Sequence, residues 1–185
     1  GRWLSKRFDV AAARAGIVLP KALRPLPAVP EAAMLDVPGL TPFLTPNDRF
    51  YRIDTALVVP QVDVESWRLK VTGMVDRELT FTFDDLLARD LVEADITLTC
   101  VSNEVGGQLA GNARWLGIPL EELLQEAGVQ RGADQIVGRS TDGYTAGFPT
   151  EAALDGRGAL VAIAMNGEPL PTRHGFPARL VVPGL

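Results

Sequence analysis

The chain is poor in the residue types that build metal cages and disulfide scaffolds. Its 185 residues include one cysteine, Cys100, and one histidine, His174. A lone cysteine allows no internal disulfide and no multi-cysteine zinc site, and a lone histidine excludes a two-histidine metal site. Aromatic residues make up only 6%, so a core must be built mainly from Val, Leu, Ala and Ile. Any chemistry must therefore depend on very few residues.

The sequence also lacks a long apolar run and an excess of positive charge. No run approaches the roughly 18 uninterrupted apolar residues of a membrane-spanning helix. The net charge of −5 argues against a nucleic-acid partner. Hydrophobic residues at 46% and charged residues at 22% favour one folded domain, with at most a small appendage.

Positive charge is concentrated at the N-terminus, where residues 1–24 carry a net charge of +5 and leave −10 for the remainder. Apolar residues are interleaved with these basic ones. This pattern predicts contact with anionic lipid headgroups. A solvated basic tail, or a surface helix over the core, is the alternative.

The ends of the chain and its proline-rich segment define the expected organisation. The chain begins with Gly1 and ends in the apolar run 179–185, which predicts a piece of a longer protein, truncated at its C-terminus. Residues 20–46 hold seven of the 14 prolines, which favours an extended segment over a long helix. The apolar residues of this segment predict that it packs on the domain. We therefore expect a lead-in over 1–41 and a domain over 42–185.

From about residue 50 the apolar pattern alternates as in β-strands. Strands are predicted at 66–71, 79–81, 94–100, 136–137, 159–165 and 180–182. Thr82 is predicted to cap a short helix, and Gly128 to end a second helix over 120–127. Asn166-Gly167 predicts a hairpin turn. Because strands outnumber helices, the fold class is α+β, a strand-dominated mixed domain.

Two places along the chain could carry chemistry. Cys100 ends a predicted strand just before the loop 101–107, and such a position presents its side chain at a rim. A buried apolar role is the alternative for a lone cysteine. His174 and Arg179, five residues apart, could hold a phosphate through charge-assisted hydrogen bonds. A histidine bonded to loop carbonyls and an arginine in a surface ion pair are the alternative there.

Other catalytic templates fit the chain poorly. It contains no phosphate-binding loop, no dinucleotide-binding glycine motif and no serine nucleophile elbow. Cys100 and His174 could formally form a nucleophile pair. The residues around them do not resemble a cysteine protease, so a thiol hydrolase is a weak alternative.

Several short motifs follow one another in a specific order between residues 42 and 185. They are Asn47-x-x-Phe50-Tyr51, 67–73, 80–86, 97–100 with Asn103, 113–120 and 174–184. This order resembles the molybdopterin-binding domain of the sulfite oxidase family. The resemblance implies the fold of that domain and a molybdopterin-dependent oxidoreductase. The implied cofactor is molybdenum bound to molybdopterin (Moco).

The resemblance also implies roles for individual residues. Cys100 would be the catalytic residue, a thiolate ligand of molybdenum beside the dithiolene sulfurs of one pterin. His174 and Arg179 would bind the pterin phosphate. Further residues implied to bind the cofactor are Tyr51, Arg52, Ser140 and Arg114.

The chain departs from the family just after the cysteine. Sulfite oxidases and plant-type nitrate reductases carry basic residues there, whereas this chain has Val101-Ser-Asn-Glu104. The resemblance implies oxygen-atom transfer to or from a small substrate. Because a carboxylate repels oxyanions, Glu104 argues against an anionic substrate such as sulfite or nitrate. Arg114 could supply a positive charge instead, or could anchor a loop beside Trp115.

Relatives with a basic, apolar lead-in are often anchored to membranes. The resemblance therefore implies a membrane-associated parent protein, with this domain outside the cytoplasm, and a redox partner protein or domain. The basic segment could instead mark a cytoplasmic face, where positive charge is enriched. The missing basic residues after Cys100 leave a competing function, a metal-free binding or scaffolding module of the same fold.

Overall fold

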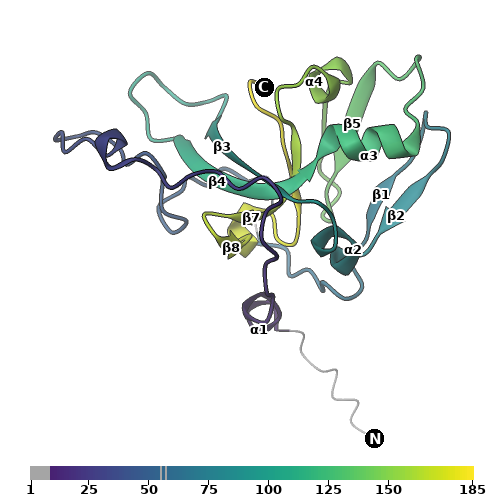
Figure 1. Cartoon of the computed structure of the whole chain (residues 1–185), viewed down its shortest axis with the longest axis horizontal. Helices are drawn as coiled ribbons and strands as arrows, with labels where there is room; N and C mark the ends of the chain where they lie inside the picture. The colour runs from purple at the N-terminus through teal and green to yellow at the C-terminus, as the bar shows by residue number, and fades with distance from the viewer. Residues whose placement is uncertain (1–8, 55, 57) are drawn as a thin grey trace, which may run out of the picture.

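The computed structural model describes residues 9–54, 56 and 58–185, and its frame is an antiparallel sheet (Figure 1). In this central sheet the strands are ordered β3-β4-β7-β8, and β9 also pairs with β7. The bounds of these strands are β3 Val92–Thr99, β4 Ala110–Pro119, β7 Leu160–Met165, β8 Glu168–Pro169 and β9 Arg179–Val181. The long strands β3 and β4 pair along their length, so the loop between them lies at one end of the sheet.

Two smaller antiparallel sheets and several short helices complete the described part of the chain. The small sheets pair β1 (Leu69–Val71) with β2 (Leu79–Phe81), and β5 (Gln135–Arg139) with β6 (Thr145–Pro149). The helices are α1 Val10–Ala15, α2 Phe83–Leu87, α3 Leu120–Ala127, α4 Glu151–Leu154 and the 3₁₀ turns η1 Glu31–Ala33 and η2 Thr172–His174. This arrangement confirms the strand-dominated α+β class. No helix within these described residues is long and apolar enough to cross a membrane.

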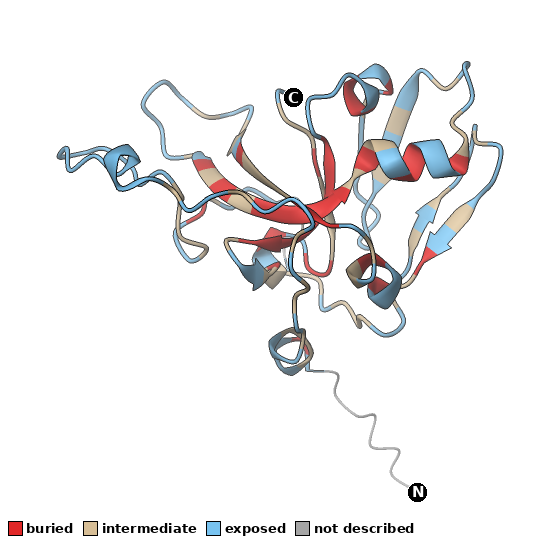
Figure 2. Ribbon diagram, viewed as in Figure 1, coloured by how far each residue is buried: buried red, intermediate tan, exposed pale blue. Residues whose placement is uncertain are grey.

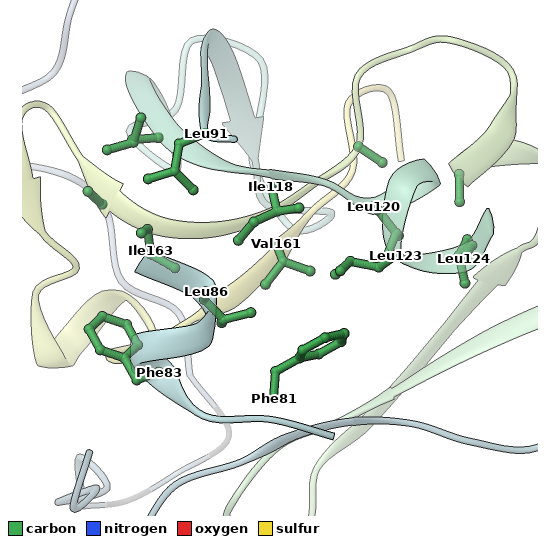
Figure 3. Close-up of a cluster of buried hydrophobic side chains, with 14 residues drawn as sticks. Phe81, Phe83, Leu86, Leu91, Ile118, Leu120, Leu123, Leu124, Val161 and Ile163 are labelled. Carbon is green, nitrogen blue, oxygen red and sulfur yellow. The ribbon is translucent and has the colours of Figure 1, made fainter. Parts of the chain in front are cut away.

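The core lies where the central sheet meets α2 and α3. Buried residues follow β4 and β7 and the inner face of α3 (Figure 2). In Figure 3 the side chains of Leu86, Ile118 and Leu123, all fully buried, converge with Phe81 and Ile163 from neighbouring elements. A second apolar cluster, around Trp115 and Phe50, packs near the start of β4. This second cluster matters for function because it supports the residues of the candidate site.

Local signals in the sequence set several element ends correctly. The second predicted helix is confirmed at Leu120–Ala127, and Gly128 ends it in the left-handed conformation (φ 70°). Asn166 (φ 52°) and Gly167 (φ 80°) form the predicted hairpin turn between β7 and β8. Thr82 caps α2 in a reciprocal capping box with Asp85. Each of these features depends on neighbouring residues alone, so the sequence pattern sufficed.

The proline-rich segment differs from the expectation. It is extended, but Met34, Leu35, Val37 and Leu40 are 53–63% exposed, so the prediction that its apolar residues pack on the domain is wrong for this stretch. Apart from one bridge between Arg24 and Val92 and the short turn η1, the segment forms no regular structure among the described residues, because its prolines interrupt both strand pairing and helix. It therefore presents no continuous apolar face. The first predicted strand is also shorter than expected, beginning at Leu69. The division at residue 41/42 stays a prediction.

Gly117 is required by close backbone packing in the central sheet. A Cβ atom there would lie 2.4 Å from the Val161 carbonyl oxygen and 2.7 Å from the Ala162 Cα, where the β4–β7 register shifts. We expect Gly117→Ala to destabilise the fold by about 3 kcal/mol, because backbone atoms must move. Thermal unfolding should show a Tm lower by roughly 6–12 °C.

Gly16 provides the control for this substitution. It has a helical φ of −80° and open surroundings, since its nearest Cβ contacts would be 3.6 Å or longer. Gly16→Ala should therefore change the free energy of unfolding by no more than about 0.5 kcal/mol. Equal losses of stability in the two variants would contradict the packing argument.

Candidate functional site

Cys100 lies one residue beyond β3, at the start of the loop that leads to β4. Its backbone N–H donates to the Leu109 carbonyl (2.8 Å), and its own carbonyl accepts from the Asn103 N–H (2.9 Å). The Asn103 side chain closes the loop, because its Oδ1 accepts from the Leu109 N–H (2.8 Å). The loop is thus held by hydrogen bonds on both sides of Cys100. The prediction that a strand presents this cysteine at a rim agrees with its half-buried position.

The Cys100 thiol is free, and its one hydrogen-bonding neighbour in the described part of the chain is Ser102. Its Sγ lies 3.0 Å from the Ser102 Oγ. Hydrogen bonding from the side chain and backbone of Ser102 lowers the pKa of Cys100, although partial burial opposes this. A thiol that ionises more easily is a better metal ligand.

Arg179 is the first residue of β9 and packs inward. Its Nη1 donates to the His174 carbonyl (3.2 Å), and its Cζ lies 5.4 Å from the centre of the Trp115 ring. Gly175 leaves room for it, since a Cβ there would meet the Arg179 side chain at 2.9 Å. Burial lowers the pKa of Arg179. Within the described residues no carboxylate forms an ion pair with this guanidinium, so most of its donors are free to bind an anion.

His174 is buried, and its backbone carbonyl is the group that accepts from Arg179. Its Nε2 is 3.3 Å from the Asn47 carbonyl, which can only accept, so this nitrogen carries a proton. Burial lowers the pKa of His174, the Asn47 contact opposes that, and nearby Arg179, Arg173 and Arg52 lower it further. Three guanidinium groups therefore gather around the histidine. Burial and these positive neighbours both disfavour the protonated imidazole.

Tyr51 connects this positive cluster to the cysteine. Its ring stacks on Phe50 at 5.3 Å, and Phe50 in turn meets the edge of the His174 ring at 5.4 Å. Burial raises the pKa of Tyr51, the charge of Arg179 lowers it, and the charge of Cys100 raises it. Tyr51 is thus close enough to both groups to feel their charges. The structure brings Cys100, Tyr51, His174 and Arg179 into one neighbourhood, although they come from three distant parts of the chain.

A set of asparagines fixes the segment that carries Tyr51. Asn166 Nδ2 donates to Asn47 Oδ1 (2.9 Å) and to the Thr45 carbonyl, and Asn47 Nδ2 donates to the Met165 carbonyl. Gly111 leaves space for the Phe50 ring, which a Cβ would meet at 2.6 Å. Sequence reasoning missed Asn166 and Gly111 as supports of the site. The only signal was the motif that contains Asn47, because the asparagine contacts join residues 118–121 positions apart and Gly111 lies 61 positions from Phe50.

Arg52 and Ser140 lie at the edge of this neighbourhood. Arg52 pairs with Asp54 (2.9 Å), and the Ser140 hydroxyl donates to Asp142 in the β5–β6 turn. The Ser140 hydrogen bond lowers the pKa of Asp142, whereas the nearby charge of Asp54 raises it. The β5–β6 turn therefore approaches the segment that carries Arg52. The hydroxyl and the guanidinium are both engaged by neighbouring carboxylates.

Arg114 is not brought together with the other candidates. It alternates with the inward-facing Trp115 along β4, so its side chain leaves the opposite face of the sheet. Its guanidinium donates to both carboxylate oxygens of Asp95 (2.8 and 2.9 Å) and to the carbonyls of Leu26 and Pro27. The structure thus supports the alternative role, anchoring of a neighbouring segment.

The site favours a bound anionic cofactor over a bare metal ion or a nucleophile pair. No group of three or more His, Cys, Asp or Glu side chains that could hold a metal exists among the described residues. No hydrogen bond joins Cys100 to His174 there, since Sγ contacts Ser102 and Nε2 contacts Asn47. A half-buried thiol and an arginine without a carboxylate partner fit a phosphate-bearing cofactor that brings its own metal ligands.

Comparisons with known proteins identify the family. Residues 56–185 match the oxidoreductase molybdopterin binding domain. The chain is 32% identical to mitochondrial sulfite oxidase of Drosophila melanogaster and 31% identical to nitrate reductase [NADH] of Solanum lycopersicum. The alignments cover 92% and 77% of this chain, but 33% and 18% of those proteins.

A solved structure is also similar to this chain. The crystal structure of the sulfane dehydrogenase SoxCD from Paracoccus pantotrophus matches with a TM-score of 0.70 and 28% identity. The match covers 78% of this chain and 40% of the SoxCD chain. The fold, the motif order and these matches agree, and the chain belongs to the oxidoreductase molybdopterin-binding domain family.

Proposed function

We propose that this domain is the Moco-binding part of an oxidoreductase that transfers an oxygen atom to or from a small substrate, with Cys100 as the protein ligand of molybdenum. The observation that carries the proposal is the match of residues 56–185 to the oxidoreductase molybdopterin binding domain, within which lie the free Cys100 thiol and an Arg179 guanidinium with no ion pair among the described residues. A thiolate at one side and a cationic cluster at the other suit the metal and the phosphate of one pterin.

Different residues of the site would hold different parts of the cofactor. Arg179 and Arg173 would bind the phosphate, and His174 would hold Arg179 in place through its backbone carbonyl. Tyr51 would contact the pterin. When bound, Moco supplies the two-electron oxygen-atom chemistry. The protein orients the cofactor and shapes access to it, and the Ser140 and Arg52 region would border the pocket.

The loop after Cys100 bears on the charge of the substrate. Val101 and Val105 are fully exposed, and the described residues include no hydrogen-bond or ion-pair partner for the Glu104 carboxylate. Arg114 does not replace the missing positive charge, because it is paired with Asp95 on the other face of the sheet. We therefore propose that the substrate is uncharged.

Glu104→Gln should improve the use of an anionic substrate. Removing the negative charge is expected to lower the KM for sulfite by roughly two- to tenfold and to leave the KM for a neutral sulfur compound unchanged. Steady-state kinetics at low ionic strength measure both. Glu78→Gln is the matched control, since Glu78 is also an exposed acid and lies one residue before β2, away from the loop after Cys100. An unchanged KM for sulfite in the Glu104 variant would argue against repulsion by this loop.

We also propose a redox partner protein and a membrane contact through residues 1–24. Within that segment Arg14 pairs with Glu168 (2.9 Å) and Arg24 approaches Glu122 (3.9 Å). These two arginines are therefore partly committed to the domain. A lipid contact would depend mainly on the basic residues within 1–8, which lie outside the described residues.

The proposed function is tested by the molybdenum and pterin content of the complete gene product, purified from a host that makes the cofactor. About one molybdenum and one pterin per chain is the expected result. Failure to bind either, even after incubation with fresh cofactor, would overturn the proposal and favour the metal-free binding module.

A further inference from the structure

Among the residues that the structure describes, Ser102 is the one polar group in hydrogen-bond contact with the Cys100 sulfur, and the proposed function gives it no role. The two side-chain atoms are 3.0 Å apart, two residues along the same loop. We propose that Ser102 is a positioning residue that donates a hydrogen bond to the Cys100 sulfur and so sets the electron donation of that sulfur to the metal. This inference rests on the proposed function, in which Cys100 binds molybdenum.

The chemistry of the two groups fixes the direction of this hydrogen bond. In the free protein either atom could be the donor, because both the thiol and the hydroxyl carry a proton. A metal-bound sulfur is a thiolate without a proton, so only the Ser102 hydroxyl can then donate. Hydrogen bonds to a charged acceptor are about twice as strong as neutral ones. The contact should therefore strengthen when the site is occupied.

The loop keeps the hydroxyl within reach of the sulfur. Cys100 is bonded through its N–H to the Leu109 carbonyl (2.8 Å) and through its carbonyl to the Asn103 N–H (2.9 Å). Asn103 is bonded in turn through Oδ1 to the Leu109 N–H (2.8 Å). Gly107 permits this closure, since a Cβ there would lie 2.6 Å from the Asn103 Oδ1. The backbone is thus pinned on both sides of Ser102, although the side chain of Ser102 is exposed.

Within the described residues no other hydrogen bond reaches the sulfur. Val101 is fully exposed and apolar, and the hydrogen bonds of Asn103 hold backbone groups. A hydrogen bond to a ligand sulfur withdraws electron density from it and raises the reduction potential of the metal. Loss of the Ser102 hydroxyl should therefore make Cys100 a stronger donor. The molybdenum potential should fall, and the sulfur-to-metal absorption band should move to longer wavelength.

The test compares Ser102→Ala, Ser102→Thr and Val101→Ala in the cofactor-loaded complete protein. Molybdenum per chain is measured first, then the midpoint potential of the metal and the position of the absorption band. We expect the potential to fall and the band to move in Ser102→Ala, both to return in Ser102→Thr, and neither to change in Val101→Ala. Loss of molybdenum from Ser102→Ala, with molybdenum retained in Ser102→Thr and Val101→Ala, would also support a role for the hydroxyl.

Two results would overturn the inference, and they differ from failure of the proposed function. If fully loaded Ser102→Ala has the midpoint potential and the absorption band of the wild type, the hydroxyl does not act on the sulfur. Equal changes in Ser102→Ala and Val101→Ala would assign the effect to loop packing. A wild-type protein that takes up no molybdenum would instead overturn the proposed function, and this inference with it.

Discussion

Arg179→Met should weaken cofactor binding by about 10- to 150-fold. Methionine keeps an unbranched apolar side chain against Trp115 but removes a guanidinium that has no carboxylate partner among the described residues. A charge-assisted hydrogen bond to a phosphate contributes roughly 1.5–3 kcal/mol, which corresponds to that loss of affinity. Titration of the cofactor-free protein with the cofactor, followed by molybdenum analysis after gel filtration, measures the effect.

Two further variants separate binding from folding in this experiment. Arg179→Lys keeps a positive charge and should lose less affinity than Arg179→Met. Arg131 is exposed, and Arg131→Ala should bind the cofactor as the wild type does. A Tm of Arg179→Met within about 4 °C of the wild type would exclude a general loss of structure. Wild-type affinity in Arg179→Met would contradict the assignment of this residue to the phosphate.

Cys100→Ser should reduce turnover by more than a hundredfold and leave the fold intact. Changes in residues that only support a metal ligand typically cost 10- to 100-fold in activity, so loss of the ligand itself should cost more. A serine hydroxyl ionises far less readily than a thiol and suits molybdenum less well than soft sulfur. Turnover per bound molybdenum is the measurement, because the arginines should still hold the pterin.

The fold should tolerate this substitution because Cys100 is half-buried and its side chain has Ser102 as its hydrogen-bond partner. Circular dichroism and the Tm should match those of the wild type, as they should in the neighbouring Val101→Ala variant. Wild-type turnover in a loaded Cys100→Ser protein would remove the cysteine from the reaction.

Sequence reasoning predicted those parts of the fold that local chemistry determines. The helix Leu120–Ala127 and its left-handed Gly128 follow from an apolar period and an end signal. The longest strand, β4, was not predicted as a strand, because its sequence from Ala110 contains two glycines and an arginine among small residues. Its pairing with β3 on one side and β7 on the other decides its conformation, and a strand partner is not visible in a short window.

The proline-rich segment shows the limit of composition as a guide. Its apolar residues predicted packing, yet Met34 to Leu40 remain exposed while Leu26 and Val29 are half-buried. The first part of the segment is held by specific polar contacts, such as that of Glu93 with the Leu26 N–H (2.7 Å). Such contacts depend on which strand lies beneath the segment, so composition alone could not locate them.

Sequence motifs indicate some residues of the candidate site. Cys100, His174 and Arg179 belong to an ordered set of motifs. In the structure, ring contacts join Tyr51 through Phe50 to His174, whose carbonyl accepts from Arg179. Their roles in cofactor binding stay predictions. The sequence left two roles open for Arg114, a charge at the site or an anchor for a loop beside Trp115. Strand alternation turns its side chain to the other face, where Asp95 binds it. The face on which a side chain emerges depends on strand register, which the sequence around Arg114 did not reveal.

The central claim is that the Cys100 sulfur is bound directly to molybdenum. X-ray absorption at the molybdenum edge tests it by counting sulfur neighbours in the loaded wild-type protein and in loaded Cys100→Ser. The account predicts one sulfur neighbour fewer in the variant, at a metal still held through the pterin. The same number of sulfur neighbours in both proteins would contradict it and would leave Cys100 outside the metal site.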